Sequence, residues 1–290
     1  MAFDSDRVGT VTFDSFGSLV DVDSTAAAVE GYVDEPVAVA REWHSRAASY
    51  GVVANQLDAY ESYYELHRLA LAYLLAAEGV SVSAEEIEEM TAIYHEMEPF
   101  GDVREGMERL HDAGYTLGVV TNGDPPMLES MVEAVGIGDF LSATVSAHEI
   151  ERHKPARELY EHAADRLDAE PATVAHVSNG YVDVQGAVHA GMQGVWLDRQ
   201  GRPRIRSGRT PTSPSTRWPN SSSTSDRYGD PTSSFDRHRG PTSSSGWYRT
   251  PTNSFDRFGA PMGRLNGYGV PSPSPIAPVP SNTTEPLENT

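Results

Sequence analysis

Cysteine is absent from the chain, and lysine occurs only once, at Lys154. The first absence excludes disulfide bonds and thiol chemistry. No apolar run approaches the roughly 18 residues that a membrane span needs, and residues 1–7 are polar. We therefore expect a cytoplasmic protein without a membrane partner, whose 290 residues can form a core without disulfide or metal support.

Positive charge is also scarce. Residues 1–200 hold 11 basic and 36 acidic side chains, whereas residues 201–290 hold 11 basic and 6 acidic ones. The formal net charge of the whole chain is -20. So acidic a surface repels nucleic acid, and concentrated salt would screen its self-repulsion. The composition is typical of halophilic proteins, in particular archaeal ones. A lysine kept in this background predicts a functional role for Lys154.

Branched apolar residues are few in residues 201–290, which are dominated by Ser, Thr, Pro, Gly and Arg. Such a segment buries too little surface to offset its ordering entropy, so we predict a disordered, low-complexity tail. One hypothesis is a frameshift near residue 200, because out-of-frame translation of a GC-rich gene tends to give this composition. The alternative is a genuine tethered extension.

Residues 21–98 are predicted to be nearly all helical. Pro36 is an acceptable helix start, and Ser83 with Glu86 forms a capping box for a later helix. Between them, a three- and four-residue spacing predicts one long helix that ends near Gly79 and buries its aromatic stripe, His67 included. The residues of this pattern are Leu57, Tyr60, Tyr64, His67, Leu71 and Leu74.

From Pro99 onward, helices and strands alternate. The predicted strands cover residues 115–120, 143–145, 173–177 and 194–197, and the helices residues 103–113, 125–135, 156–167 and 182–190. This alternation predicts an α/β fold with a parallel sheet. We expect a Rossmann-like core of residues 1–20 and 99–200, an inserted all-helical cap of residues 21–98, and a cleft between them.

Polar residues follow the predicted strands of this core. Asp14 ends the first strand, and ligands bind at such strand ends in α/β sheets. Taken alone, Asp14 could equally cap a turn. The other polar positions are Thr121-Asn122-Gly123, Lys154-Pro155 and the turn of residues 178–183.

These four positions, in this order, resemble the haloacid dehalogenase superfamily, which uses a nucleophilic Asp, a Ser or Thr, a Lys and a terminal acidic turn. The similarity is closer to its L-2-haloacid dehalogenases (haloacid dehalogenase type II) than to its phosphatases. The phosphatases normally carry a second Asp two residues after the nucleophile, where this chain has Phe16, and an acid for Mg²⁺ where it has Ser178. The opening motif of residues 13–19 and Glu98-Pro99-Phe100 are also similar.

The resemblance implies hydrolytic dehalogenation of short L-2-haloacids to 2-hydroxy acids, without metal or cofactor. Asp14 would displace the halide and form an ester, which water then hydrolyses. Lys154 would keep Asp14 ionised, Asp183 would pair with Lys154 and assist the water, and Ser178 completes the predicted catalytic set. The predicted substrate-binding residues are Phe16, Ser18, Thr121, Asn122, Tyr160 and Asn179.

Two positions depart from the resembling family. The family has a Trp-Arg phrase that helps to hold the halide, and this chain has Trp43-His44. His44 could replace the arginine only when protonated, or Arg41, one helical turn earlier, could reach the site. Gly180 stands where the family usually has Asn.

Two other functions stay open at this point. A phosphatase that uses Asp14 with Mg²⁺ would hydrolyse generic phosphate esters, and Phe16 argues against it. A non-catalytic binding protein would keep the pocket but release no halide. The resemblance further raises a homodimer as an expectation, and the sequence does not choose the substrate chain length or halogen.

Overall fold

The computed structural model describes residues 3–199 and the pair Gly267–Tyr268. A central sheet has the strand order β3-β2-β1-β4-β5-β6. β1 to β5 are parallel, as predicted, and β6 pairs antiparallel with β5. The strands are β1 (Thr10–Phe13), β2 (Thr116–Thr121), β3 (Leu141–Ser146), β4 (Val174–Ser178), β5 (Gln193–Trp196) and β6 (Gly267–Tyr268).

The predicted disorder of residues 201–290 falls outside the described residues, apart from the two residues of β6. Within the described part, β1 and β4 are buried along their whole lengths. Polar side chains buried in these two strands need hydrogen-bond partners, and Thr12 of β1 and His176 of β4 are hydrogen-bonded to each other.

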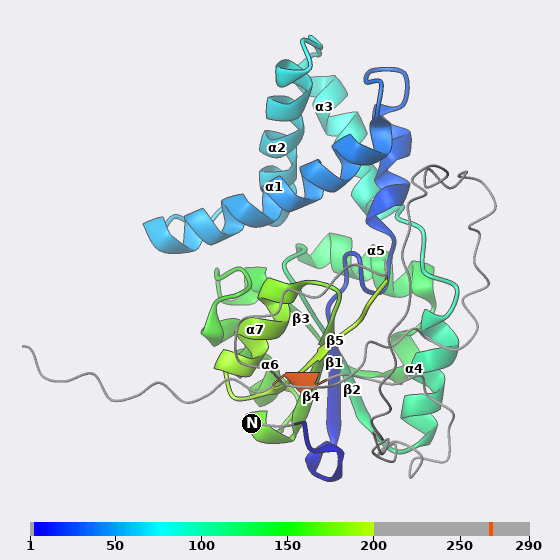
Figure 1. Ribbon diagram of the computed structural model, residues 1–290, viewed down its shortest axis with the longest axis vertical. Coiled ribbons are helices and arrows are strands. Elements are labelled where there is room, and N and C mark those ends of the chain that lie inside the picture. The colour runs from blue at the N-terminus through cyan, green and yellow to red at the C-terminus, as the bar shows by residue number, and fades with distance from the viewer. Residues whose placement is uncertain (1–2, 200–266, 269–290) are drawn as a thin grey trace, which may run out of the picture.

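Helices cover both faces of the sheet. They are α4 (Val103–Asp112), α5 (Pro125–Val135), α6 (Arg157–Arg166) and α7 (Tyr181–His189). Right-handed crossovers place α4 and α5 on one face and α6 and α7 on the other, and Figure 1 shows α4 to the right of the sheet and α6 and α7 to its left. The strand order therefore reverses between β1 and β4, the place where open α/β sheets bind ligands.

A group of helices connects β1 to α4, and we call residues 21–98 the helical cap. Its helices are η2 (Val22–Val29), α1 (Pro36–Leu57), α2 (Tyr63–Ala77), α3 (Ala84–Thr91) and η3 (Ala92–His95). They pack on one another and lie above the carboxyl ends of the strands in Figure 1. Trp43 and Tyr94 are fully buried between them, with ring centroids 5.0 Å apart.

The long helix predicted from Leu57 to Gly79 was wrong in its first part. α1 ends at Leu57, and Asp58 then takes a left-handed conformation with φ 54°. α2 starts only at Tyr63, after the Ser62 side chain accepts a hydrogen bond from the Glu65 N–H. The apolar spacing continues across this break although the two helices are separate, and Leu57, the last residue of α1, is 71% exposed.

Other cap predictions had mixed outcomes. The helical region expected from residue 21 is a 3-10 helix, η2, that ends at Val29. The helix start at Pro36 and the Ser83 capping box are both confirmed, and His67 is fully buried, as expected. Among residues 3–199 and 267–268, no helix is both long and apolar enough to cross a membrane.

Candidate active site

Asp14 is the first residue after β1, at the point where the strand order reverses. Its backbone N–H donates to the Val177 carbonyl of β4 at 2.9 Å, so the neighbouring strand holds the turn in place. Its side chain points into a cavity of about 540 Å³ between the strand ends and α1. The predicted strand-end carboxylate therefore faces a space that can hold a small molecule.

Lys154 lies between two carboxylates. Its Nζ donates to Asp14 Oδ1 and to Asp183 Oδ2, at 2.9 Å each, and the side chain is only 6% exposed. Its backbone N–H donates to Asn122 Oδ1 at 2.7 Å, so the loop after β2 positions the lysine loop. Burial alone would lower the pKa of Lys154, but the two carboxylates raise it, and the ammonium stays charged.

Asp183, in the first turn of α7, receives further hydrogen bonds. The Tyr160 hydroxyl donates to Oδ1 at 2.6 Å, and His176 Nε2 lies 3.1 Å from both carboxylate oxygens. Burial would raise the pKa of Asp183, but Lys154 and His176 together hold it well below its usual value. Asp183 is therefore a fixed anion rather than a strong base.

The second oxygen of Asp14 faces two serine hydroxyls. Ser18 Oγ donates to Oδ2 at 2.7 Å and Ser178 Oγ at 3.3 Å. Backbone N–H groups of Asn179 and Gly180 donate to these two hydroxyls at 2.9 and 3.0 Å, which directs the hydroxyl protons toward Asp14. Both oxygens of the carboxylate are thus oriented before any ligand arrives.

Of the predicted site residues, nine line the cavity. They are Asp14, Phe16, Arg41, His44, Asn122, Lys154, Ser178, Asn179 and Asp183. Three predicted substrate-binding residues do not line it: Ser18 and Tyr160 bind the two carboxylates, and Thr121 is turned away. The Thr121 hydroxyl lies 2.6 Å from Ser15 Oγ and accepts from the Gly123 N–H at 3.0 Å.

The halide-side candidates have different surroundings. Arg41 is exposed at the cavity edge, where its Nε donates to Asp23 Oδ1 at 2.7 Å. His44 is half-buried, and its Nδ1 has no hydrogen-bond partner. Burial lowers the pKa of His44, although the charge of Asp14 acts in the opposite direction. The lowered pKa makes His44 neutral near pH 7. Arg41 already has Asp23 as a carboxylate partner.

Sequence reasoning missed three residues at the site. Tyr63 lines the cavity and stacks on Phe16, with ring centroids 6.0 Å apart. His176 and Thr12 lie below Asp183, with Thr12 Oγ1 2.9 Å from His176 Nδ1. The available signal for His176 was its place in the middle of the apolar run of residues 174–177, whereas Thr12 follows the alternation of Thr and apolar residues in β1 and gave no such signal.

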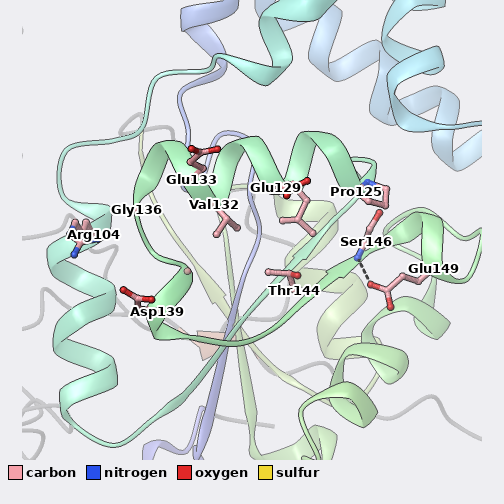
Figure 2. A pocket seen from close by; sticks show the side chains of 12 residues that line it. Arg104, Pro125, Glu129, Val132, Glu133, Gly136, Asp139, Thr144, Ser146 and Glu149 are labelled. Atoms are coloured by element: carbon pink, nitrogen blue, oxygen red, sulfur yellow. Dashed lines mark hydrogen bonds between the residues drawn. The ribbon is translucent and has the colours of Figure 1, made fainter.

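A second pocket, of about 750 Å³, lies along α5 and the edge strand β3 (Figure 2). Arg104 stands at one end of it, and Ser146 and Glu149 stand at the other. Glu149 already accepts from the Ser146 N–H at 3.1 Å and pairs with His162 at 2.9 Å. This pocket contains none of the predicted catalytic residues, so the smaller cavity at Asp14 is the candidate active site.

Known proteins are similar to this chain in sequence and in fold. An (S)-2-haloacid dehalogenase 4A of Burkholderia cepacia is 29% identical over 202 residues, which cover 68% of this chain and 86% of that protein. An (S)-2-haloacid dehalogenase 1 of Pseudomonas sp. (strain CBS-3) is 27% identical over 203 residues, which cover 69% of this chain and 88% of that protein. The structure of the L-2-haloacid dehalogenase of Xanthobacter autotrophicus, solved with chloropropionic acid covalently bound, matches this one with a TM-score of 0.64 and 26% sequence identity. The match covers 67% of this chain and 79% of that chain.

The family model for haloacid dehalogenase-like hydrolases matches residues 8–191. This match includes β1 with Asp14, the whole helical cap, and the turns that carry Lys154 and Asp183. The chain therefore belongs to the haloacid dehalogenase-like hydrolases.

Proposed function

We propose that the protein hydrolyses L-2-haloacids to 2-hydroxy acids through an ester on Asp14, without a metal. The observation that carries this proposal is the buried Lys154 ammonium 2.9 Å from both Asp14 and Asp183. Its positive charge stabilises the two carboxylates that it contacts and holds Asp14 in place at the cavity.

In the first step, a carboxylate oxygen of Asp14 attacks the substrate Cα from the side opposite the halogen. The new C–O bond forms as the C–halogen bond breaks, and the halide leaves with that electron pair. The configuration at Cα inverts. Ser18 and Ser178 keep the carboxylate in one orientation for this attack, because both hydroxyls bind Asp14 Oδ2.

In the second step, water attacks Cγ of the Asp14 ester. The ester bond breaks, the 2-hydroxy acid leaves, and one proton is released. Asp183 lines the cavity beside Lys154 and accepts a hydrogen bond from the water. Because its pKa is well below the usual value, it orients the water and does not keep the proton.

Carbon rather than phosphorus is the favoured electrophile. Phe16 occupies the position two residues after Asp14, and its ring contacts Tyr63 and Tyr94 at centroid distances of 6.0 and 5.8 Å. An aromatic side chain there cannot protonate a leaving oxygen, as an Mg²⁺-dependent phosphatase requires. It instead gives an apolar wall suited to a carbon–halogen bond.

The direct test is chloride release from L-2-chloropropionate in a chloride-free potassium sulfate buffer. We expect turnover by the wild type and none by Asp14→Asn. Asp112→Asn is a matched control, because Asp112 is exposed at the end of α4, and it should keep full activity. No halide from any 2-haloacid, or Mg²⁺-dependent hydrolysis of a phosphate ester, would contradict the proposal.

A further inference from the structure

The peptide group between His153 and Lys154 is held from both the core and the cap. Its N–H, that of Lys154, donates to Asn122 Oδ1 at 2.7 Å in the core loop after β2. Its carbonyl, that of His153, accepts from Asn55 Nδ2 at 2.7 Å and from the Ala156 N–H at 3.0 Å. Asn55 belongs to α1, so a cap side chain orients the backbone directly before the active-site lysine.

The Asn55 side chain forms a second hydrogen bond with the same residue. The His153 N–H donates to Asn55 Oδ1 at 3.0 Å, so both ends of the amide are used and its orientation is fixed. His153 is fully buried, and buried backbone groups need such partners because water does not reach them. The amide therefore pairs with the backbone of His153 much as a neighbouring strand would.

Gly51 lies one helical turn before Asn55, on the same side of α1. A Cβ atom at Gly51 would lie 3.0 Å from Cγ and 3.2 Å from Cβ of the His153 side chain. The imidazole has little room to move, since it stacks on Tyr60 with ring centroids 5.0 Å apart and its Nε2 lies 2.9 Å from the Glu61 carbonyl oxygen. Glycine thus lets α1 come close enough for the Asn55 amide to reach the backbone.

The position of this backbone matters for the ammonium of Lys154. Its Nζ lies 2.9 Å from both Asp14 and Asp183, at the end of a flexible four-carbon chain. Both contacts are kept together only while the lysine Cα stays in place. A displacement of about 1 Å in an active site can lower turnover about 100-fold.

We propose that Asn55 is a positioning residue. Its amide fixes the backbone before Lys154 and thereby keeps the ammonium against Asp14 and Asp183, and Gly51 makes this contact possible. The expected effect on turnover rests on the proposed function, whereas the state of the lysine is measured without substrate. The cap then helps to build the catalytic centre in addition to lining the cavity.

The single lysine of the chain gives a direct readout. Protein labelled with ¹³C at lysine Cε shows one lysine signal in NMR spectra, and trinitrobenzenesulfonate at pH 8 modifies one ε-amine, which peptide mass mapping separates from the α-amine. Asn55→Leu keeps a similar side-chain size but removes both hydrogen bonds. It should shift the ¹³Cε signal and speed the modification of Lys154 about tenfold, the ratio expected for about one lost hydrogen bond.

Turnover of L-2-chloropropionate gives the second readout. Asn55→Leu should lower kcat about tenfold to 100-fold and change KM less than about threefold, because Asn55 does not line the cavity. Gly51→Ala should lower kcat about threefold to tenfold, since the added Cβ displaces His153. Alanine favours a helix over glycine, so this loss cannot come from a weaker α1, and Gly51→Ala carries the test alone if Asn55→Leu does not fold.

Arg152→Met is the matched control. Arg152 Nη2 lies 2.5 Å from Asp58 Oδ1, so this ion pair joins the same end of α1 to the same loop through exposed side chains. Its loss should change kcat and the lysine reactivity less than about twofold. An unchanged lysine signal and kcat in Asn55→Leu and Gly51→Ala, or equal losses in Asn55→Leu and Arg152→Met, would overturn the inference.

The two readouts separate this inference from the proposed function. If no 2-haloacid releases halide but the lysine reactivity rises in Asn55→Leu and Gly51→Ala, the dehalogenase proposal fails and the positioning role stands. If the wild type releases halide and both variants match it in lysine reactivity and kcat, only the positioning role fails.

Discussion

Replacement of Lys154 by methionine tests the electrostatic centre of the site. Methionine fills a similar space but removes the ammonium that lies 2.9 Å from both Asp14 and Asp183. Their side chains are only 16% and 11% exposed, so water cannot replace the lysine fully. Breaking a buried ion pair by removing one partner costs about 3–5 kcal/mol, and we expect a loss of this size in unfolding free energy at pH 7.

The loss should depend on pH with a defined sign. In the wild type the pKa of Asp183 is lowered: burial acts to raise it, but Lys154 and His176 prevail. Its stabilising contribution is thus present above the unfolded pKa, about 3.9, and is lost as pH falls through the folded value. Without Lys154, the largest influence that lowers the pKa of Asp183 is removed while burial still raises it. Protonation of Asp183 as the pH falls from 7 to 5 should therefore recover about 1–2 kcal/mol.

Urea unfolding at pH 7 and pH 5 measures both effects. The control is Arg157→Met, which removes an exposed pair with Glu161 at 2.7 Å on α6 and should cost about 0.5 kcal/mol or less at either pH. A penalty for Lys154→Met below about 1 kcal/mol at pH 7, or one that does not shrink at pH 5, would refute the reasoning.

Two further predictions concern histidines. Burial lowers the pKa of His44 below its ordinary value of 6.5, so acidification should charge this side chain and tighten inhibition by bromide about tenfold. The variant His44→Arg should instead be inhibited tightly at every pH. Bromide inhibition constants measured across pH test this, and constants that do not change with pH in the wild type would contradict it. His176→Phe removes the contacts at 3.1 Å to both oxygens of Asp183 and should cost about 1.5–3 kcal/mol of stability and slow ester hydrolysis about tenfold. Urea unfolding and steady-state turnover test this, and unchanged turnover would show that Asp183 needs no support from His176.

The catalytic charges could be predicted from the sequence because they occupy places that the topology of a parallel sheet brings together. Asp14 follows β1 and Ser178 ends β4, and these strands are neighbours. Lys154 stood out because the chain has no other lysine. Strand order and residue type were therefore enough to assemble the centre of the site.

Orientation could not be predicted in the same way. Thr121 ends β2 as expected, but its hydroxyl binds Ser15 instead of lining the cavity, since a strand-end position does not determine the rotamer. The charge state of His44 depends on its burial, which the pattern of α1 does not show. The break at Asp58 was hidden because the apolar spacing continued through it.

The central claim is that Asp14 itself becomes an ester, and oxygen isotope labelling tests it most directly. One turnover with excess enzyme in H₂¹⁸O should place ¹⁸O in the Asp14 carboxylate, because water attacks Cγ, while the hydroxy acid carries an unlabelled oxygen from Asp14. Mass spectrometry of the peptide that contains Asp14 would show a gain of one label. Label found in the hydroxyl group of the product, with none in Asp14, would mean that water attacks the substrate directly and would contradict the account.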